Sequence, residues 1–287
     1  MTRRFLLWTL IVVLALSAAF VLNALRGRLG WTATTLSPAE LSEQLSPGFT
    51  WTRPEGDGPF PAALLLSGCD GPQDNVARLA ARLAEAGWLS LNVDSHGPRE
   101  LDDRQMWRLV CAGQLLNGAE RAADIAVALA ALRARDDVDP ERIALIGMSH
   151  GGWATLDFLV LSEAGTVPPL LTEWPATLPA RRHAGIRGVV LYYPYCGQAS
   201  LASVSDLPTD LGYRFLLVEE DTIVDERECL EVAGSLLAHD ADVAVTLYEG
   251  VTHSFDQQDI SFLSPLEFDR DATERAIAET LRFLDTL

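Results

Sequence analysis

The sequence contains no lysine, so its 22 basic residues are all arginines, against 40 aspartates and glutamates. The formal net charge is −18, and the four charged residues before residue 31 are all arginines, so the remainder carries −22 (−18 minus 4). A surface of that sign repels a phosphate backbone, which makes nucleic acid a poor partner. We interpret the acidity as a source of solubility rather than as a site for a cationic substrate.

Cysteine is also scarce, and its four positions lack the paired spacing of zinc ligands, so we expect no metal site. In an oxidising compartment Cys111, Cys196 and Cys229 could supply one disulfide, but its pairing cannot be read from the sequence. We expect Cys69 to be a small packing residue, with a reactive thiol as the alternative. No internal repeat or low-complexity tract is present.

Residues 1–28 differ in character from the rest of the chain. Arg3 and Arg4 precede an apolar run over residues 5–25, and Arg26 and Arg28 close it. The run is long enough to cross a bilayer, which takes about 20 residues, whereas a cleaved signal peptide has a shorter core of roughly 7–15. Small residues over 15–19 leave cleavage open. We predict an uncleaved signal-anchor with the following domain outside the cytoplasm.

From residue 49 to the end, short apolar runs alternate with amphipathic helical stretches, after a linker over residues 29–48. This alternation predicts one α/β domain over residues 49–287, with a mainly parallel twisted sheet and helices on both faces. Residues 163–185 are rich in proline and lack periodicity, so they form either a cap over the pocket or a surface excursion. The predicted strands span residues 49–53, 62–66, 88–93, 143–148, 188–193, 213–219 and 243–248, and the helices 75–86, 119–135, 153–161, 226–239 and 270–284.

One stretch indicates chemistry directly. A buried strand over residues 143–148 leads into Gly147-Met148-Ser149-His150-Gly151, and an apolar helix follows. Strand, Gly-x-Ser-x-Gly and helix together are typical of a nucleophile elbow, where a sharp turn lifts the serine above the sheet edge. A flexible turn would explain the five residues alone, but not their context. We therefore predict that Ser149 is a nucleophile.

A serine needs a base and an orienting acid, and chain order places them after the elbow. His253 follows the last predicted strand, and its loop can reach Ser149 at the same sheet edge. Asp221 follows the preceding strand and is the predicted acid, with Asp225 and Glu220 as alternatives. The oxyanion would be held by backbone N–H groups of His150, directly after the nucleophile, and of Cys69 in the glycine-rich loop over residues 68–71.

Five stretches spread from about residue 60 onward resemble the dienelactone hydrolase family of the α/β-hydrolase superfamily. The resemblance implies an α/β-hydrolase fold, ester hydrolysis, and Ser149, Asp221 and His253 as nucleophile, acid and base. Three departures are visible: the family proper has a cysteine nucleophile, its Asp-x-x-Val-Pro motif ends here in Asp225, and its members lack an N-terminal anchor. The stretches are residues 66–71, 93–99, 147–152, 192–197 and 248–256.

Other side chains are candidates for a pocket. Arg99 and Arg104 could meet a carboxylate substrate, although solvated ion pairs with Asp102 and Asp103 are the plainer expectation. Trp107 and Trp153 could line an apolar pocket or simply pack in the core.

The sequence therefore predicts a membrane-anchored serine hydrolase acting on a small-molecule carboxylic ester, without metal or organic cofactor. A peptidase on the same fold is the nearest alternative. A non-catalytic envelope binding protein that keeps the fold is the alternative from another class.

Overall fold

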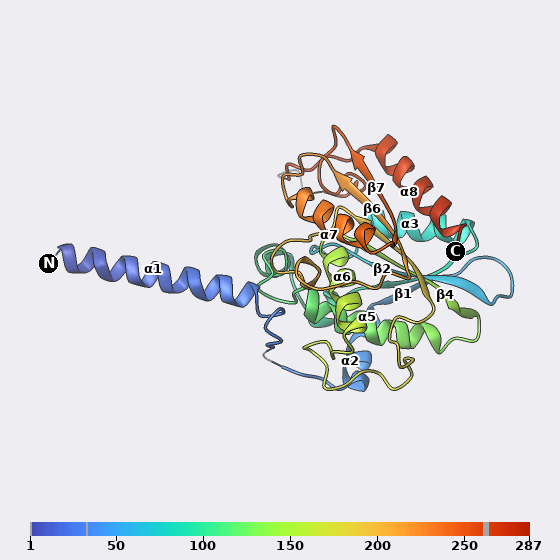
Figure 1. The fold of residues 1–287 in the computed structure, drawn as a ribbon, viewed down its shortest axis with the longest axis horizontal. Helices are drawn as coiled ribbons and strands as arrows, with labels where there is room; N and C mark the ends of the chain where they lie inside the picture. Colours follow the sequence, from blue (N-terminus) through green and yellow to red (C-terminus); the bar gives the residue numbers. More distant parts are fainter. Residues whose placement is uncertain (1, 33, 261–263) are drawn as a thin grey trace.

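A seven-stranded sheet with helices on both faces makes up the body of the chain in a computed structural model that describes residues 2–32, 34–260 and 264–287 (Figure 1). The strand order is β1-β3-β2-β4-β5-β6-β7, and every neighbouring pair is parallel except β1 with β3. The predicted mainly parallel α/β fold is confirmed. The strands are β1 (Phe49–Thr52), β2 (Phe60–Leu66), β3 (Leu89–Val93), β4 (Val138–Met148), β5 (Ile186–Tyr192), β6 (Gly212–Val218) and β7 (Asp242–Tyr248).

Side chains of each central strand alternate between two cores because successive residues of a strand point to opposite faces. Leu64 and Leu66 of β2 belong to the core that α2, α5, α6 and α7 cover, whereas Ala63 and Leu65 belong to the core that α3 and α8 cover. All four side chains are buried, which explains why the strands read as continuous apolar runs. The helices are α2 (Pro38–Leu45), α3 (Asp74–Glu85), α5 (Gly118–Arg133), α6 (His150–Glu163), α7 (Glu226–Ala238) and α8 (Arg270–Leu284), with the single turn α4 (Asp103–Gln105) before α5.

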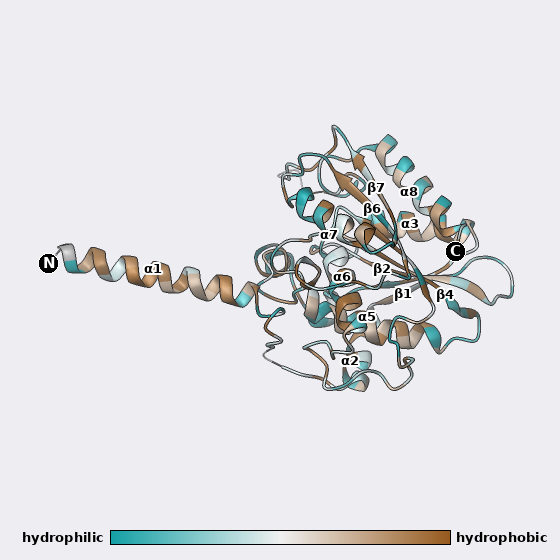
Figure 2. Cartoon of the chain, in the orientation of Figure 1, coloured by the Kyte–Doolittle hydropathy of each residue, from teal (hydrophilic) through white to brown (hydrophobic). Residues whose placement is uncertain are grey.

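Helix α1 (Thr2–Ala24) projects from this body as an isolated rod (Figure 1). Its residues Arg4–Ala24 are long and apolar enough to cross a membrane, and none of that stretch is buried against the protein. Figure 2 shows hydrophobic residues along most of the rod, and between Phe5 and Leu22 only Thr9 and Ser17 are polar, which leaves no polar stripe. A soluble surface helix would be apolar on one side only.

The segment expected to be a linker, residues 29–48, contains more structure than its sequence suggested. Ser37 begins α2 with a capping box in which its hydroxyl accepts from the Glu40 N–H and Glu40 accepts from the Ser37 N–H. Leu41 and Leu45 of α2 are fully buried in the core. Residues 36–48 therefore belong to the packed body.

Residues 163–185 cover another part of the molecule than the serine. Leu36 and Leu171 form a parallel bridge, and Leu170, Trp174 and Leu178 are buried in the core beside α2 and α6. This segment follows the C-terminal end of α6, whereas Ser149 precedes its N-terminal end. The segment therefore packs against α2 and α6.

Asp157 of α6 gives the fold a specific dependence on pH. Its carboxylate is fully buried and accepts hydrogen bonds from the Ser200 hydroxyl (2.8 Å) and the Leu201 N–H (2.7 Å). Burial raises the pKa of Asp157 from its usual 3.8 to about 7. Because the folded state holds the proton more tightly, the stability associated with this group is lost as pH rises from about 4 to about 7.

We expect Asp157→Asn to be more stable than the wild type at pH 8, by roughly 4 kcal/mol at most, and the gap to close near pH 4. Asparagine keeps an oxygen that accepts both hydrogen bonds but carries no charge to bury. Urea unfolding of both proteins at the two pH values measures the difference. A gap of equal size at pH 4 and pH 8 would contradict the assignment.

Candidate active site

The turn that carries Ser149 has the strained backbone of a nucleophile elbow. Ser149 has φ 50° and ψ −114°, a combination that L-residues rarely adopt, between the end of β4 and the start of α6. The glycines around it permit this close approach of strand and helix. A Cβ on Gly147 would lie 2.6 Å from the Gly151 carbonyl oxygen, and one on Gly151 would lie 2.2 Å from the Leu66 carbonyl oxygen.

The structure brings Ser149, His253 and Asp221 together. The His253 Nε2 lies 2.9 Å from the Ser149 Oγ, and its Nδ1 lies 2.7 Å from the Asp221 Oδ2. The histidine and aspartate side chains are only 4% and 1% exposed. These residues follow β4, β6 and β7, so the carboxyl edge of the parallel sheet gathers them from distant parts of the sequence.

Of the three acids considered, only Asp221 reaches the histidine. Its Oδ1 accepts from the Ile223 N–H at 2.8 Å, and this turn directs Oδ2 toward His253. Asp225 instead caps α7 and forms an ion pair with Arg227 at 2.8 Å. Glu220 is exposed, with φ 54°.

The loop expected to complete an oxyanion site lies directly beside Ser149. A Cβ on Gly68 would be 3.8 Å from the Ser149 Cβ, and Cys69 lines the same cavity as Ser149. Among the described residues, neither the Cys69 nor the His150 backbone N–H has a hydrogen-bond partner. Two free donors therefore stand near the serine, as an oxyanion requires.

Cys69 has a role that the sequence did not indicate, because it forms a disulfide with Cys111. The expectation of a small packing residue was therefore wrong. The bridge ties the loop beside Ser149 to the segment that follows η3 (Met106–Val110). Cys196 and Cys229 form a second disulfide, so two bridges are present where one was expected.

A buried arginine forms a hydrogen bond to the backbone at the start of the Cys69 loop. The Arg121 side chain of α5 is fully buried, and its Nη1 donates to the Ser67 carbonyl oxygen at 3.1 Å and lies 3.1 Å from the His150 Nδ1. Burial lowers the pKa of Arg121 to about 10, so the guanidinium stays charged at neutral pH. Burial, and then that charge, hold the pKa of His150 well below its usual range. The His150 side chain therefore faces Arg121, and not the serine hydroxyl.

Tyr193 is a second residue whose part in the site was missed. Its ring lies 4.7 Å from the His253 ring, measured between centroids, and its hydroxyl donates to the buried Asp256. Asn75 donates to the same carboxylate at 3.3 Å, and burial raises the pKa of Asp256. The sequence offered a signal, since Tyr193 and Asp256 both fall in stretches that carry the family resemblance.

A small, largely apolar cavity of about 80 Å³ opens beside Ser149. Trp107, Ile223 and Leu266 line it, and no residue of 163–185 does. Trp153 instead lies in the interior between His150 and Tyr195. The expected ion pairs of Arg99 were wrong: both of its Nη atoms bind the buried Asp124, at 2.7 and 2.9 Å.

The partners expected for Arg99 and Arg104 lie at the start of α4: Asp102 directly precedes this turn and Asp103 is its first residue. Asp102 caps this turn through the Gln105 N–H. Arg104 is exposed, as a solvated side chain would be.

The Cys69–Cys111 bridge leads to a prediction about catalysis. We expect Cys111→Ser to lower kcat by roughly 10–10²-fold, because a loosened loop displaces an oxyanion donor. Cys229→Ser removes the other bridge and is the matched control, for which we expect lost stability with kcat retained. Ester hydrolysis and thermal unfolding of both variants separate the two effects. Equal kcat values for the two variants would contradict the role given to the Cys69 loop.

Comparison with known proteins identifies the family. The model of the dienelactone hydrolase family matches residues 49–168 and 174–287. A Bradyrhizobium protein named as a probable 2-oxo-3-(5-oxofuran-2-ylidene)propanoate lactonase is 23% identical over 207 residues, which cover 71% of this chain and 76% of the relative.

Two solved structures share the fold. Butyrate-bound esterase 2 of Thermogutta terrifontis has a TM-score of 0.62 at 15% identity, covering 83% of this chain and 88% of its own. A dienelactone hydrolase-like promiscuous phosphotriesterase from metagenomic libraries has a TM-score of 0.62 at 21% identity, covering 81% and 88%. Because the family match spans nearly the whole body of the chain, this protein belongs to the dienelactone hydrolase family and is a hydrolase of the α/β-hydrolase fold.

Proposed function

We propose that this hydrolase cleaves a small carboxylic ester through an acyl-enzyme on Ser149, with His253 as base and Asp221 as the orienting acid. The observation that carries the proposal is the pair of contacts made by His253, to the Ser149 Oγ at 2.9 Å and to the Asp221 Oδ2 at 2.7 Å. A serine hydroxyl is a weak nucleophile unless a base in this position accepts its proton.

In the first half of the reaction, the Ser149 Oγ attacks the ester carbonyl while its proton passes to the His253 Nε2. The negative charge that develops on the carbonyl oxygen is held by the N–H groups of Cys69 and His150. Loss of one such donor costs about 2.7–4 kcal/mol of transition-state stabilisation. His253 then returns the proton to the departing alcohol, and the acyl group stays on Ser149.

In the second half, His253 takes a proton from water, and the resulting hydroxide attacks the acyl-enzyme. The C–Oγ bond breaks, the proton returns to Ser149, and the carboxylic acid leaves. Asp221 holds the imidazole in one tautomer and stabilises its positive charge in both halves. A lactonase and an esterase among the relatives support an ester rather than a peptide as the substrate.

The full chain in detergent tests this proposal with p-nitrophenyl acetate and a fluorophosphonate probe. We expect hydrolysis of the ester and a single covalent adduct, which peptide mass spectrometry should locate on Ser149. Absence of both hydrolysis and adduct would overturn the proposed function.

We further propose that α1 stays on the mature protein as a membrane anchor and that the domain lies outside the cytoplasm. Two disulfides support an oxidising compartment. The Arg26 Nη2 also lies 2.5 Å from the Glu120 Oε2, so the chain directly after α1 packs into the body. Carbonate extraction and N-terminal sequencing test this anchor. A soluble protein that begins near residue 20 would contradict it.

A further inference from the structure

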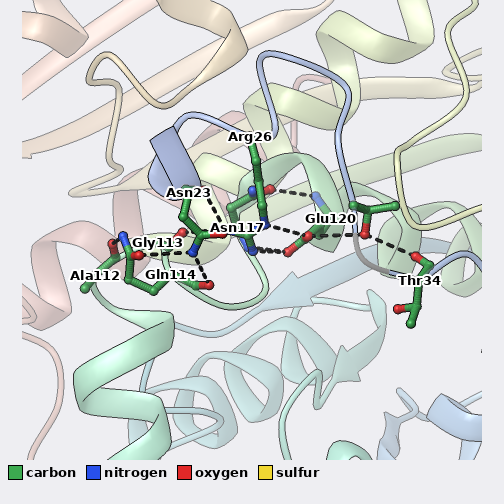
Figure 3. Close-up of polar contacts among 9 residues, drawn as sticks. Asn23, Arg26, Thr34, Ala112, Gly113, Gln114, Asn117 and Glu120 are labelled. Carbon is green, nitrogen blue, oxygen red and sulfur yellow. Dashed lines mark hydrogen bonds and ion pairs between the residues drawn. The ribbon is translucent and has the colours of Figure 1, made fainter. Parts of the chain in front are cut away.

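The end of α1 is clamped to the body by buried polar contacts (Figure 3). Arg26 binds Glu120 through two hydrogen bonds of 3.0 and 2.5 Å, and these side chains are only 11% and 8% exposed. Glu120 also accepts from the Asn117 N–H at 3.0 Å, so the pair is tied to the start of α5. A Cβ on Gly27 would lie 2.9 Å from the Asn117 Oδ1, which shows how closely the chain packs here.

A second set of contacts joins the last turn of α1 to the segment before α5. Asn23 donates to the Gln114 carbonyl oxygen at 2.8 Å, and the Gln114 Nε2 donates back to the Phe20 carbonyl oxygen at 3.1 Å. Arg26 donates to the Gly113 carbonyl oxygen at 2.9 Å. Residues 113–114 therefore lie against the last two turns of α1.

The length of α1 fixes where this contact falls relative to a bilayer. The 21 residues Arg4–Ala24 span about 30 Å at 1.5 Å per residue, which equals the thickness of the hydrocarbon core. The helix is therefore just long enough to cross the hydrocarbon core, and its last turn reaches the membrane surface. Because Asn23 and Arg26 contact Gln114 and Gly113, the segment that carries residues 113–114 lies beside this end of the span.

These two segments carry exposed apolar side chains, although they belong to an acidic domain. Trp107, Leu109 and Leu115 are 52%, 39% and 37% exposed, and Trp31 just after the anchor is 63% exposed. Tryptophan favours the membrane interface because its ring is apolar and its N–H is polar. The other tryptophans outside α1, namely Trp51, Trp88, Trp153 and Trp174, are buried or partly buried.

The catalytic edge of the sheet faces the same way as α1. The C-terminal Leu287 packs on Gly188 near the start of β5, which places the C-terminus at the amino edge of the sheet. In Figure 1, α1 leaves the body on the side opposite the C-terminus. Trp107 connects these features directly, because it lines the cavity beside Ser149 and is one of the exposed apolar side chains.

We propose that Trp31, Trp107, Leu109 and Leu115 rest in the headgroup region of the bilayer that α1 enters, so that Ser149 acts on esters held in that membrane. This inference rests on the proposed ester hydrolysis and on the proposed membrane anchor. The cavity beside Ser149 is small, at about 80 Å³, so we expect it to take a short acyl group while the larger apolar part of such an ester stays at its mouth. The substrate class is a short-chain acyl ester of a membrane-held, long-chain alcohol.

Charge favours a zwitterionic over an anionic membrane surface. The chain after residue 31 carries a formal −22 (−18 minus 4 for the arginines before it), which repels anionic headgroups. The contact is therefore apolar, and phosphatidylcholine vesicles are the appropriate test membrane.

Contact with the bilayer is tested without any substrate by quenching of tryptophan fluorescence. The full chain is placed in phosphatidylcholine vesicles that carry bromine atoms near the headgroups, and wild type is compared with Trp107→Phe and Trp174→Phe. We expect the emission that is lost in Trp107→Phe to be quenched by the bromine atoms, and the emission that is lost in the buried control Trp174→Phe to be unquenched. Equal quenching of the two contributions would overturn the inference.

Access to membrane-held esters is tested by adding charge to the face outside the cavity. We expect Leu109→Glu/Leu115→Glu to hydrolyse hexadecyl acetate in vesicles about tenfold more slowly, because a carboxylate resists transfer from water into the apolar interface. Hydrolysis of soluble p-nitrophenyl acetate should not change. The matched control, Leu237→Glu/Leu247→Glu on α7 and β7, should keep both activities.

The outcomes separate the two proposals. Loss of neither activity in Leu109→Glu/Leu115→Glu would overturn the membrane-facing site while the proposed ester hydrolysis stands. A wild type that hydrolyses neither ester would overturn the proposed function itself. Hydrolysis of p-nitrophenyl acetate without hydrolysis of the vesicle-held ester would also overturn the membrane-facing site.

Discussion

Replacing Ser149 by alanine is expected to lower kcat for p-nitrophenyl acetate by roughly 10⁶-fold, because the reaction loses its nucleophile and His253 loses its proton donor. The change removes one oxygen atom at the end of β4 and leaves the strained turn intact. The remaining N–H groups of Cys69 and His150 would still polarise the ester, so a low rate above that of water should persist. Steady-state kinetics together with loss of the fluorophosphonate adduct measure the effect.

The chain offers a matched control for this substitution. The Ser162 Oγ lies 2.7 Å from the His183 Nδ1, and the His183 Nε2 lies 3.4 Å from the Glu163 carboxylate. This serine thus has a histidine and an acid nearby, but it lies in the last turn of α6, at the opposite end of that helix from the elbow. Ser162→Ala is expected to keep full activity. Comparable losses in Ser149→Ala and Ser162→Ala would show that a contact with histidine does not identify the nucleophile.

The features of this molecule that can be predicted from the sequence are those that depend on local patterns. The apolar run before Ser149 and the two flanking glycines predict the elbow from fewer than ten residues. In the structure, Ser149 has the strained φ of 50°. Parallel topology then adds the rest, since strand ends share one edge of the sheet. His253 and Asp221 could be chosen for that reason, although no local pattern separates Asp221 from Asp225.

What the sequence does not reveal depends on contacts between distant segments. Cys69 and Cys111 meet only because the segment before α5 folds over the strand-end loop, and 42 positions separate them. The sequence predicts that Arg99 pairs with its neighbours along the chain, but the fold brings it to Asp124, one of the buried residues of α5. The clamp between Arg26 and Glu120 is of the same kind, since a charged residue flanking an apolar run ordinarily indicates only the end of a membrane span.

The choice among the three acids leads to the second large expected effect. We expect Asp221→Asn to lower kcat roughly 10⁴-fold, because the substitution changes the tautomer of His253 and also removes the negative charge beside it. The asparagine oxygen can keep the hydrogen bond from the Ile223 N–H, which turns its NH₂ group toward the His253 Nδ1. The His253 Nδ1 must then accept a hydrogen bond from this NH₂ group, so the ring proton moves to Nε2. A histidine with its proton on Nε2 can no longer take the proton of Ser149.

Asp225→Asn is the control, since it makes the same chemical change four residues away. Asparagine caps a helix as well as aspartate does, so α7 should keep its start, and only the exposed pair with Arg227 is lost. We expect unchanged kcat and thermal unfolding in this variant. A loss in Asp225→Asn that matches the loss in Asp221→Asn would move the acid to Asp225. Because the Asp221 side chain is 1% exposed and contacts the histidine at 2.7 Å, we expect the large effect at Asp221 alone.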